Sequence, residues 1–237
     1  MEESRNISTR ERICLKALLL VMAAGCTSCN SPSNATESNE FKVVTVEKRL
    51  DSSSSPVGYW GTSLTYPQLI QAGKKTLDSV NKQIDALVDR YSCQGPGDQA
   101  FTAEPIYSNG RALSFYYEAT WMCESMPSPD STSGTANYNL ETGASLTVNE
   151  EFLDATSQKR FIELANQLLE EKLRKLPEED ISGCAPFENA RNALITAQGI
   201  ELRGLPPIHG EPDCPVSVLI PKTELGSFFK PDSVILK

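Results

Sequence analysis

Two stretches of the chain carry apolar residues at helical spacing, and both are predicted to form amphipathic helices. The apolar positions of the first stretch are Leu77, Val80, Ile84, Leu87, Val88 and Tyr91. Those of the second are Phe161, Ala165, Leu168, Leu169, Leu173 and Leu176. Gly95-Pro96-Gly97 follows the first stretch and Pro177 follows the second, and these residues are typical helix stops.

Alternation of apolar and polar residues predicts several strands. The clearest comes after Ser108-Asn109-Gly110, a hairpin turn signal, and its apolar face holds Leu113, Phe115, Tyr117, Ala119, Trp121 and Cys123. A strand over residues 41–50 alternates poorly, which favours a sheet edge. Later segments with strand patterns are 193–197, 200–205 and 214–220, before a short helix over 222–229. Runs of strands with two helices between them predict an α+β fold, with a mostly antiparallel sheet on which the two helices pack.

The beginning of the chain follows a different pattern. An uninterrupted apolar run, 17–25, is preceded by Arg5, Arg10, Arg12 and Lys16, which is the arrangement of an export signal. A membrane-spanning helix is the alternative, but it needs about 20 apolar residues. Residues 26–40 are mostly Ser, Asn, Thr, Glu and Pro, and they predict a flexible tether. The sequence therefore predicts a signal peptide over 1–25, a tether over 26–40 and one folded domain over 41–237.

Four of the seven cysteines lie within the predicted domain. Because an exported chain meets an oxidising compartment, an even number of cysteines predicts two disulfides. A zinc site is the alternative, but no C-x-x-C pair is present. Three pairings are possible, and we expect Cys93 with Cys123 and Cys184 with Cys214, because each joins the end of a helix-like segment to a later strand. Cys29 is left as an odd thiol in the tether.

The chain has a net charge of −9, and loss of residues 1–25, with four basic and three acidic side chains, would make it −10. This charge argues against a nucleic-acid partner, since phosphates need a surface rich in Lys and Arg. It is compatible with a basic protein partner, although acidity is more often a matter of solubility.

Ala23-Ala24-Gly25-Cys26 resembles the bacterial lipobox, in which the cysteine receives a diacylglycerol before cleavage. Lipoboxes usually have Leu where Ala23 stands. Cys29 is a poorer match, because Cys26-Thr27-Ser28 before it lack the apolar residue and the Gly or Ala at the cut. The resemblance implies lipidation of Cys26 and anchoring to a membrane of the cell envelope. Thr27 follows the cysteine where an Asp would resemble an inner-membrane retention signal, so we expect the periplasmic side of the outer membrane.

Several segments of the domain are similar to a bacterial extracytoplasmic family of unknown general function. These segments are 66–69, 136–152 with the helix after it, 199–202 and 216–225. The family includes lysozyme-sensing anti-sigma factors of the RsiV type, the N-terminal region of peptidoglycan deacetylases of the PdaC type, and many envelope lipoproteins. The resemblance implies an envelope-facing binding module without an active site.

One departure from the family concerns the turn after its long strand. The family usually has a turn of the Gly-Gly-Ala-His type, whereas this chain has residues 122–134, which are rich in Ser and Pro. We expect a long loop here, either a divergent binding surface or merely a variable one. Asp130 in this loop is a candidate ligand-binding residue. The other candidates are in the loop Pro206–Asp213: His209, Glu211 and Asp213.

Catalytic patterns are weak in this sequence. His209 is the single histidine, and no G-x-S-x-G elbow is present to supply a serine nucleophile. The acidic pairs 150–151 and 178–179 are adjacent in sequence, so their side chains usually point apart. No motif for a metal, a phosphate or another cofactor appears. We therefore expect a lipid-anchored, non-catalytic binding lipoprotein for lysozyme or peptidoglycan; the alternatives are a structural or protein-interaction lipoprotein and, less favoured, a cell-wall hydrolase that uses His209.

Overall fold

The computed structural model describes residues 41–56, 58–70, 75–177, 181, 184–204, 214 and 216–236. The six strands of the first sheet are β1 (Phe41–Asp51), β2 (Tyr59–Leu69), β3 (Gly97–Ser108), β4 (Ala112–Cys123), β5 (Asp130–Asn139) and β6 (Ala144–Ser145). Those of the second are β7 (Ala193–Ile195), β8 (Gly199–Arg203) and β9 (Ser217–Pro221). The helices are α1 (Lys75–Arg90), the 3-10 turn η1 (Val148–Glu151), α2 (Ala155–Leu173) and α3 (Lys222–Leu225).

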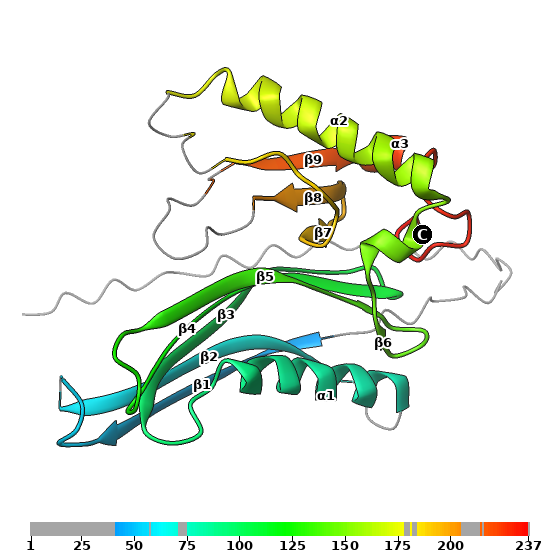
Figure 1. The fold of residues 1–237 in the computed structure, drawn as a ribbon. Helices are drawn as coiled ribbons and strands as arrows, with labels where there is room; N and C mark the ends of the chain where they lie inside the picture. Colours follow the sequence, from blue (N-terminus) through cyan, green and yellow to red (C-terminus); the bar gives the residue numbers. More distant parts are fainter. Residues whose placement is uncertain are drawn as a thin grey trace, which may run out of the picture. The chain divides into compact units, whose positions relative to one another are not determined.

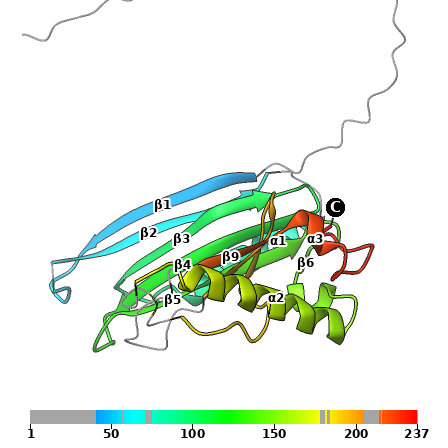
Figure 2. The same ribbon diagram turned by 90° about the horizontal axis from the view of Figure 1, so that it is seen from above.

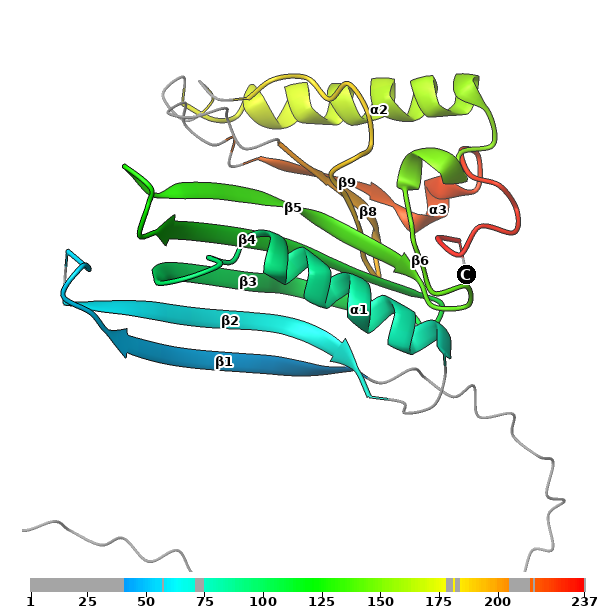
Figure 3. The same ribbon diagram turned by 60° about the horizontal axis from the view of Figure 1, so that its bottom comes forward.

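The six strands of the first sheet follow the order β1-β2-β3-β4-β5-β6, and all neighbours are antiparallel except β2 and β3. Two parallel neighbours cannot be joined by a tight turn, so the chain needs a crossover between them, and α1 provides it. Figure 3 shows α1 lying across one face of this sheet. The mostly antiparallel α+β fold predicted from the sequence is confirmed.

Between α1 and the sheet lies the first of two hydrophobic cores. The helix contributes Leu77, Val80, Ile84 and Val88, which are the positions that its periodicity predicted. The sheet contributes alternating residues of β3 and β4, including Phe101, Leu113, Phe115 and Tyr117. The alternation along β4 therefore identifies the face of the sheet that α1 covers.

The second core lies on the other side of the six-stranded sheet. The three-stranded sheet, in the order β7-β8-β9, lies between the six-stranded sheet and α2 (Figure 1). Phe161, Ala165 and Leu169 of α2 pack in one cluster with apolar residues of all three strands. At the start of α2 the backbone N–H of Ser157 donates to the Asp154 carboxylate at 2.7 Å, and this bond lowers the pKa of Asp154.

The structure confirms several predictions and corrects others. Both amphipathic helices are present, β1 is an edge strand, and both disulfides pair as expected. The prediction of a long loop over 122–134 is wrong. Strand β4 runs to Cys123 and β5 starts at Asp130, so only a short hairpin turn separates them. The final helix is shorter than expected, since α3 ends at Leu225. Within the described residues, no helix is long and apolar enough to cross a bilayer.

Candidate functional site

The face of the six-stranded sheet that α1 does not cover is divided into two halves. Seen from above, the layer of β9 and α2 lies over β4 and β5 and leaves β1 and β2 uncovered (Figure 2). We call the half under the three-stranded sheet the covered half. The part over β1, β2, the start of β3 and the end of β4 is the open half.

In the covered half, two buried polar side chains bind the edge of β7. The Ile195 N–H donates to Ser114 Oγ at 2.9 Å, and Asn137 Nδ2 donates to the Ala193 carbonyl at 3.0 Å. The Ser114 hydroxyl in turn donates to Asn137 Oδ1 at 2.5 Å. The two side chains therefore act for β7 as a neighbouring strand would, and they satisfy backbone groups that would otherwise be buried without partners.

In the open half lies a groove of about 690 Å³. The register of the strands places two rows of residues side by side across its floor. One row consists of Glu47, Ser63, Ala100 and Thr120. The other consists of Arg49, Gly61, Asp98 and Met122. The floor thus combines hydroxyl groups, charges of both signs and apolar surface, which suits a polar ligand that also has apolar faces.

The second row holds the charged groups of the groove in place. Asp98 accepts a hydrogen bond of 2.7 Å from the backbone N–H of Gly61. The Arg49 guanidinium lies 4.0 Å from the centre of the Tyr59 ring and 3.4 Å from Asp51 Oδ1. Gly61 leaves room beside these groups, because a Cβ there would come no closer than 3.6 Å to Asp98 Oδ1. A larger side chain at Gly61 would therefore occupy the groove without straining the backbone.

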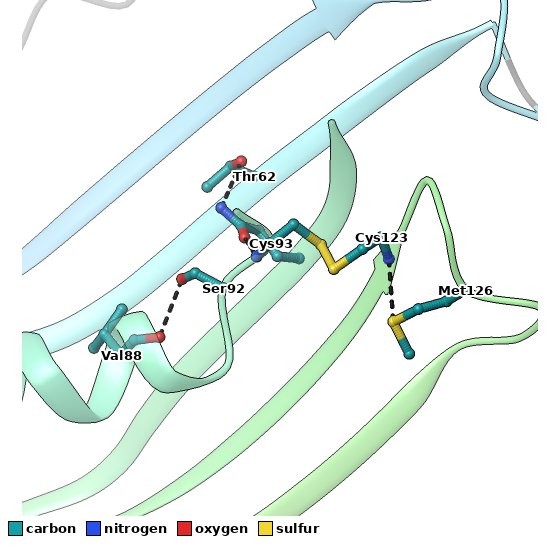
Figure 4. The surroundings of a disulfide bond; sticks show 7 residues. Thr62, Val88, Ser92, Cys93, Cys123 and Met126 are labelled. Atoms are coloured by element: carbon teal, nitrogen blue, oxygen red, sulfur yellow. Dashed lines mark hydrogen bonds between the residues drawn. A yellow bond between two sulfur atoms is a disulfide. The ribbon is translucent and has the colours of Figure 1, made fainter. Parts of the chain in front are cut away.

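The Cys93–Cys123 disulfide joins the segment after α1 to the last residue of β4, next in sequence to Met122 of the groove (Figure 4). The Cys93 N–H donates to Gln99 Oε1 at 2.7 Å, and Gln99 Nε2 donates to Thr62 Oγ1 at 3.1 Å. Gly97 is required beside the bridge, because a Cβ there would clash with Cys93 Sγ. The disulfide thus ties the end of α1 and the end of β4 to the strands that line the groove.

Tyr116 marks the boundary between the two halves. Arg203 of β8 lies 4.5 Å from the centre of the Tyr116 ring and forms a salt bridge of 3.1 Å with Glu201. Burial raises the pKa of Tyr116, although a hydrogen bond with Ser133 lowers it again. This phenol is therefore neutral near pH 7, with Ser133 and Glu118 as its hydrogen-bond partners.

The residues singled out from the sequence are not brought together by the described structure. Asp130 lies at the start of β5, opposite Trp121, on the face that α1 covers. The lipidation candidate Cys26 and the loop residues His209, Glu211 and Asp213 lie outside the described residues. No group of three metal-ligating side chains occurs in the described part of the chain.

Sequence reasoning missed the residues that line the groove. Tyr59, Gly61 and Asp98 lie in or beside strands whose alternation is interrupted by Gly, Pro and Thr, so β2 and β3 were not predicted. The one available signal was the β-propensity of Tyr59–Leu69, which is rich in aromatic and Thr residues.

No protein-family model matches the chain, and no curated protein sequence matches it. Two solved structures have a similar fold. A DUF3298-family protein of Bacteroides fragilis has a TM-score of 0.56 and 11% sequence identity, over 83% of this chain and 95% of that one. A DUF3298-family protein of Pseudomonas aeruginosa PAO1 has a TM-score of 0.58 and 12% identity, over 82% of this chain and 96% of that one. At these identities the likeness shows the fold alone, and this fold is one found in a family of domains of unknown function.

Proposed function

We propose that this protein is a lipid-anchored binding lipoprotein of the cell envelope, which holds peptidoglycan in the groove of the open half and does not cleave it. The observation that carries the proposal is the groove itself, whose floor of hydroxyls, Arg49 and Asp98 lies beside the half-buried Tyr59 ring. Peptidoglycan presents sugar hydroxyls, amides and carboxylates, and these groups match such a floor. Lipidation of Cys26 would hold the domain within reach of the cell wall.

The volume and the setting of the groove support this choice. Ligand sites for small molecules typically enclose about 300–1,000 Å³, so a groove of about 690 Å³ has room for a disaccharide with part of its peptide. The two disulfides suit an extracytoplasmic compartment, where reduction is slow. The fold shared with DUF3298 proteins is compatible with this role and does not name a ligand.

A second candidate ligand is a basic cell-wall hydrolase such as lysozyme. The net charge of −9 supports it, because an acidic protein attracts a basic enzyme at low ionic strength. The two ligands differ in their dependence on salt. Binding of lysozyme should weaken strongly between low and physiological ionic strength, whereas binding of a nearly neutral glycan should change little.

The test is a binding assay with the full chain, produced in an exporting bacterial host and purified in mild detergent. Soluble peptidoglycan fragments and lysozyme are titrated separately, each at low and at physiological salt. Gly61→Leu should weaken fragment binding by about tenfold, because its side chain fills the groove. Gly226→Leu is the matched control, since a Cβ there meets nothing within 4 Å and the residue is exposed.

Two outcomes would contradict the proposal. Equal fragment binding by the two glycine variants would place the ligand elsewhere on the chain. Release of new sugar ends from peptidoglycan by the wild-type chain, lost in His209→Ala, would make the protein a hydrolase. Salt-sensitive binding of lysozyme alone would favour the second candidate.

A further inference from the structure

A second groove, of about 580 Å³, lies at the opposite edge of the six-stranded sheet. It runs along the outer edge of β5, because four consecutive residues of that strand, 135–138, line it. Arg90 at the end of α1 flanks it on one face of the sheet. Arg191, just before β7, flanks it on the other face. We call this the cationic groove.

The cationic groove carries positive charge in an acidic protein. None of the residues that line it is an Asp or a Glu. Arg90 and Arg191 are both exposed, and neither belongs to an ion pair within the described residues. Two Asp residues of α1 act on β2 instead: Asp85 accepts a hydrogen bond from Gln68, and burial together with the charges of Asp85 and Asp89 raises the pKa of Tyr66. Two unpaired guanidinium groups here would attract a ligand with carboxylates.

Neutral polar side chains also line the cationic groove. Tyr117 and Tyr138 both line the groove; the Tyr117 hydroxyl lies 3.5 Å from that of Tyr91, and the Tyr138 hydroxyl can donate to an anion. Burial raises the pKa of Tyr138 to about 12 and raises that of Tyr117 as well, so neither phenol becomes an anion near pH 7. Gln83, Ser145 and Thr147 add further polar side chains to the lining.

The backbone edge of β5 is open beside this groove. The Leu146 N–H donates to the Asn137 carbonyl at 2.7 Å and the Gly143 N–H donates to the Asn139 carbonyl at 2.8 Å, so the odd-numbered residues of β5 direct their backbone groups outward. After Leu146 the chain leaves β5 and enters η1. Within the described residues, no strand pairs with the outer edge of β5 from Asp130 to Ala136.

We propose that an extended acidic peptide of a partner protein adds to this edge of β5 and places two consecutive carboxylates against Arg90 and Arg191. Strand addition satisfies the outward backbone groups of Ser131, Ser133 and Thr135. Successive side chains of an added strand point to opposite faces of the sheet. Because the two arginines also lie on opposite faces, adjacent acidic residues reach both, whereas acidic residues two positions apart reach only one.

This interaction goes beyond the proposed function, since it uses the opposite edge of the sheet from the open half. Either site can fail without affecting the other. Binding of peptidoglycan fragments tests the groove beside Gly61, and binding of peptides tests the cationic groove.

The experiment measures fluorescence anisotropy of labelled octapeptides with the full chain in mild detergent at low salt. The first peptide is acetyl-Thr-Val-Thr-Glu-Glu-Val-Thr-Val-amide. The second has the same composition but places one residue between the two Glu, and the third has Lys in place of Glu. We expect the first to bind about tenfold more tightly than the second, and the third not to bind.

Variants of the protein test separately the contacts of the two arginines and the backbone pairing along β5. Arg90→Gln and Arg191→Gln should each weaken binding of the first peptide about fivefold or more. Arg174→Gln makes the same charge change at the end of α2 and should not weaken it. Ser133→Pro should abolish binding, because it removes one outward N–H; edge strands tolerate Pro at such a position. Ser133→Ala keeps that N–H and should bind normally, and urea unfolding of both variants checks that the fold is retained.

Three results would overturn the proposal. One is the absence of binding by any octapeptide at concentrations up to about 1 mM, a range in which even weak complexes are detected. Another is equal binding of the two Glu peptides. The third is unchanged binding in Ser133→Pro together with displacement by inorganic polyphosphate, which would make the groove a site for polyanions rather than for a strand.

Discussion

The covered half and the open half of the same sheet face carry similar polar side chains with opposite consequences. In the covered half, Ser114 and Asn137 have exposed fractions of 0% and 6%, and their polar groups bind the backbone of β7. In the open half, Ser63 and Thr120 are exposed in the groove floor. A polar residue on a strand therefore stabilises the fold or remains available for a ligand according to the layer above it.

The two disulfides also differ in the half of the sheet face to which they belong. Cys93–Cys123 holds the end of β4, a strand that lines the groove of the open half, whereas Cys184–Cys214 joins segments of the covering layer. Each closes a loop with a sequence separation of 30 residues. They should therefore contribute similarly to stability and differently to binding.

The largest expected effect comes from removing one disulfide at a time. Two double variants remove one disulfide each: Cys93→Ser with Cys123→Ser, and Cys184→Ser with Cys214→Ser. Each should lower the free energy of unfolding by about 3 to 4 kcal/mol, because the unfolded chain gains conformational entropy when a loop of this length is opened. Urea unfolding measures this loss. Binding of peptidoglycan fragments should weaken only in the first pair of variants, and an equal loss in both pairs would contradict the assignment of the site to the open half.

A smaller effect on stability is expected from substituting a single polar residue in each half of the sheet face. Asn137→Ala should lower the free energy of unfolding by about 2 to 3 kcal/mol, because the Ala193 carbonyl and the Ser114 hydroxyl lose buried partners. Thr120→Ala in the open half should change it by less than about 0.5 kcal/mol, as is usual for exposed positions. Similar losses in the two variants would show that the covering layer does not bury Asn137.

The smallest expected effect concerns alkaline pH and the face that α1 covers. Burial raises the pKa of Tyr138 to about 12, above the ordinary value of 10.0 that applies to the unfolded chain. Between these values the unfolded chain loses the Tyr138 proton while the folded chain keeps it, so stability decreases as pH rises. The loss should be about 1 kcal/mol by pH 11, measured from urea midpoints at successive pH values. Tyr138→Phe should remove this part of the decrease, and an unchanged pH profile in that variant would show that Tyr138 ionises normally.

Sequence reasoning succeeded where one face of an element is buried and the other is not. The spacing of Leu77 to Val88 and the alternation along β4 both report such one-sided burial, and both predictions are confirmed. It failed for β5, where Asp130–Gly134 looks like a loop because its residues are small and polar. These residues form a strand because β4 supplies backbone partners along their whole length, and that information is not local.

The Cys93–Cys123 pairing was also predictable, because Cys93 closely follows α1 and Cys123 ends β4. Gly97 was expected only as part of a helix stop, and the structure adds its close approach to Cys93 Sγ. The groove residues were not predictable, since Arg49, Gly61 and Asp98 meet only through the register of three strands.

The amino-acid sequence by itself therefore determined the two helices, the best-patterned strands, the even number of cysteines in the domain and the acidic charge. Each of these depends on neighbours within a few residues or on composition. Only the tertiary structure decided that the strands form two sheets, and that the smaller sheet covers half of one face of the larger. Which polar side chains remain free for a ligand follows from that placement, because burial and strand register depend on contacts between segments far apart in the chain.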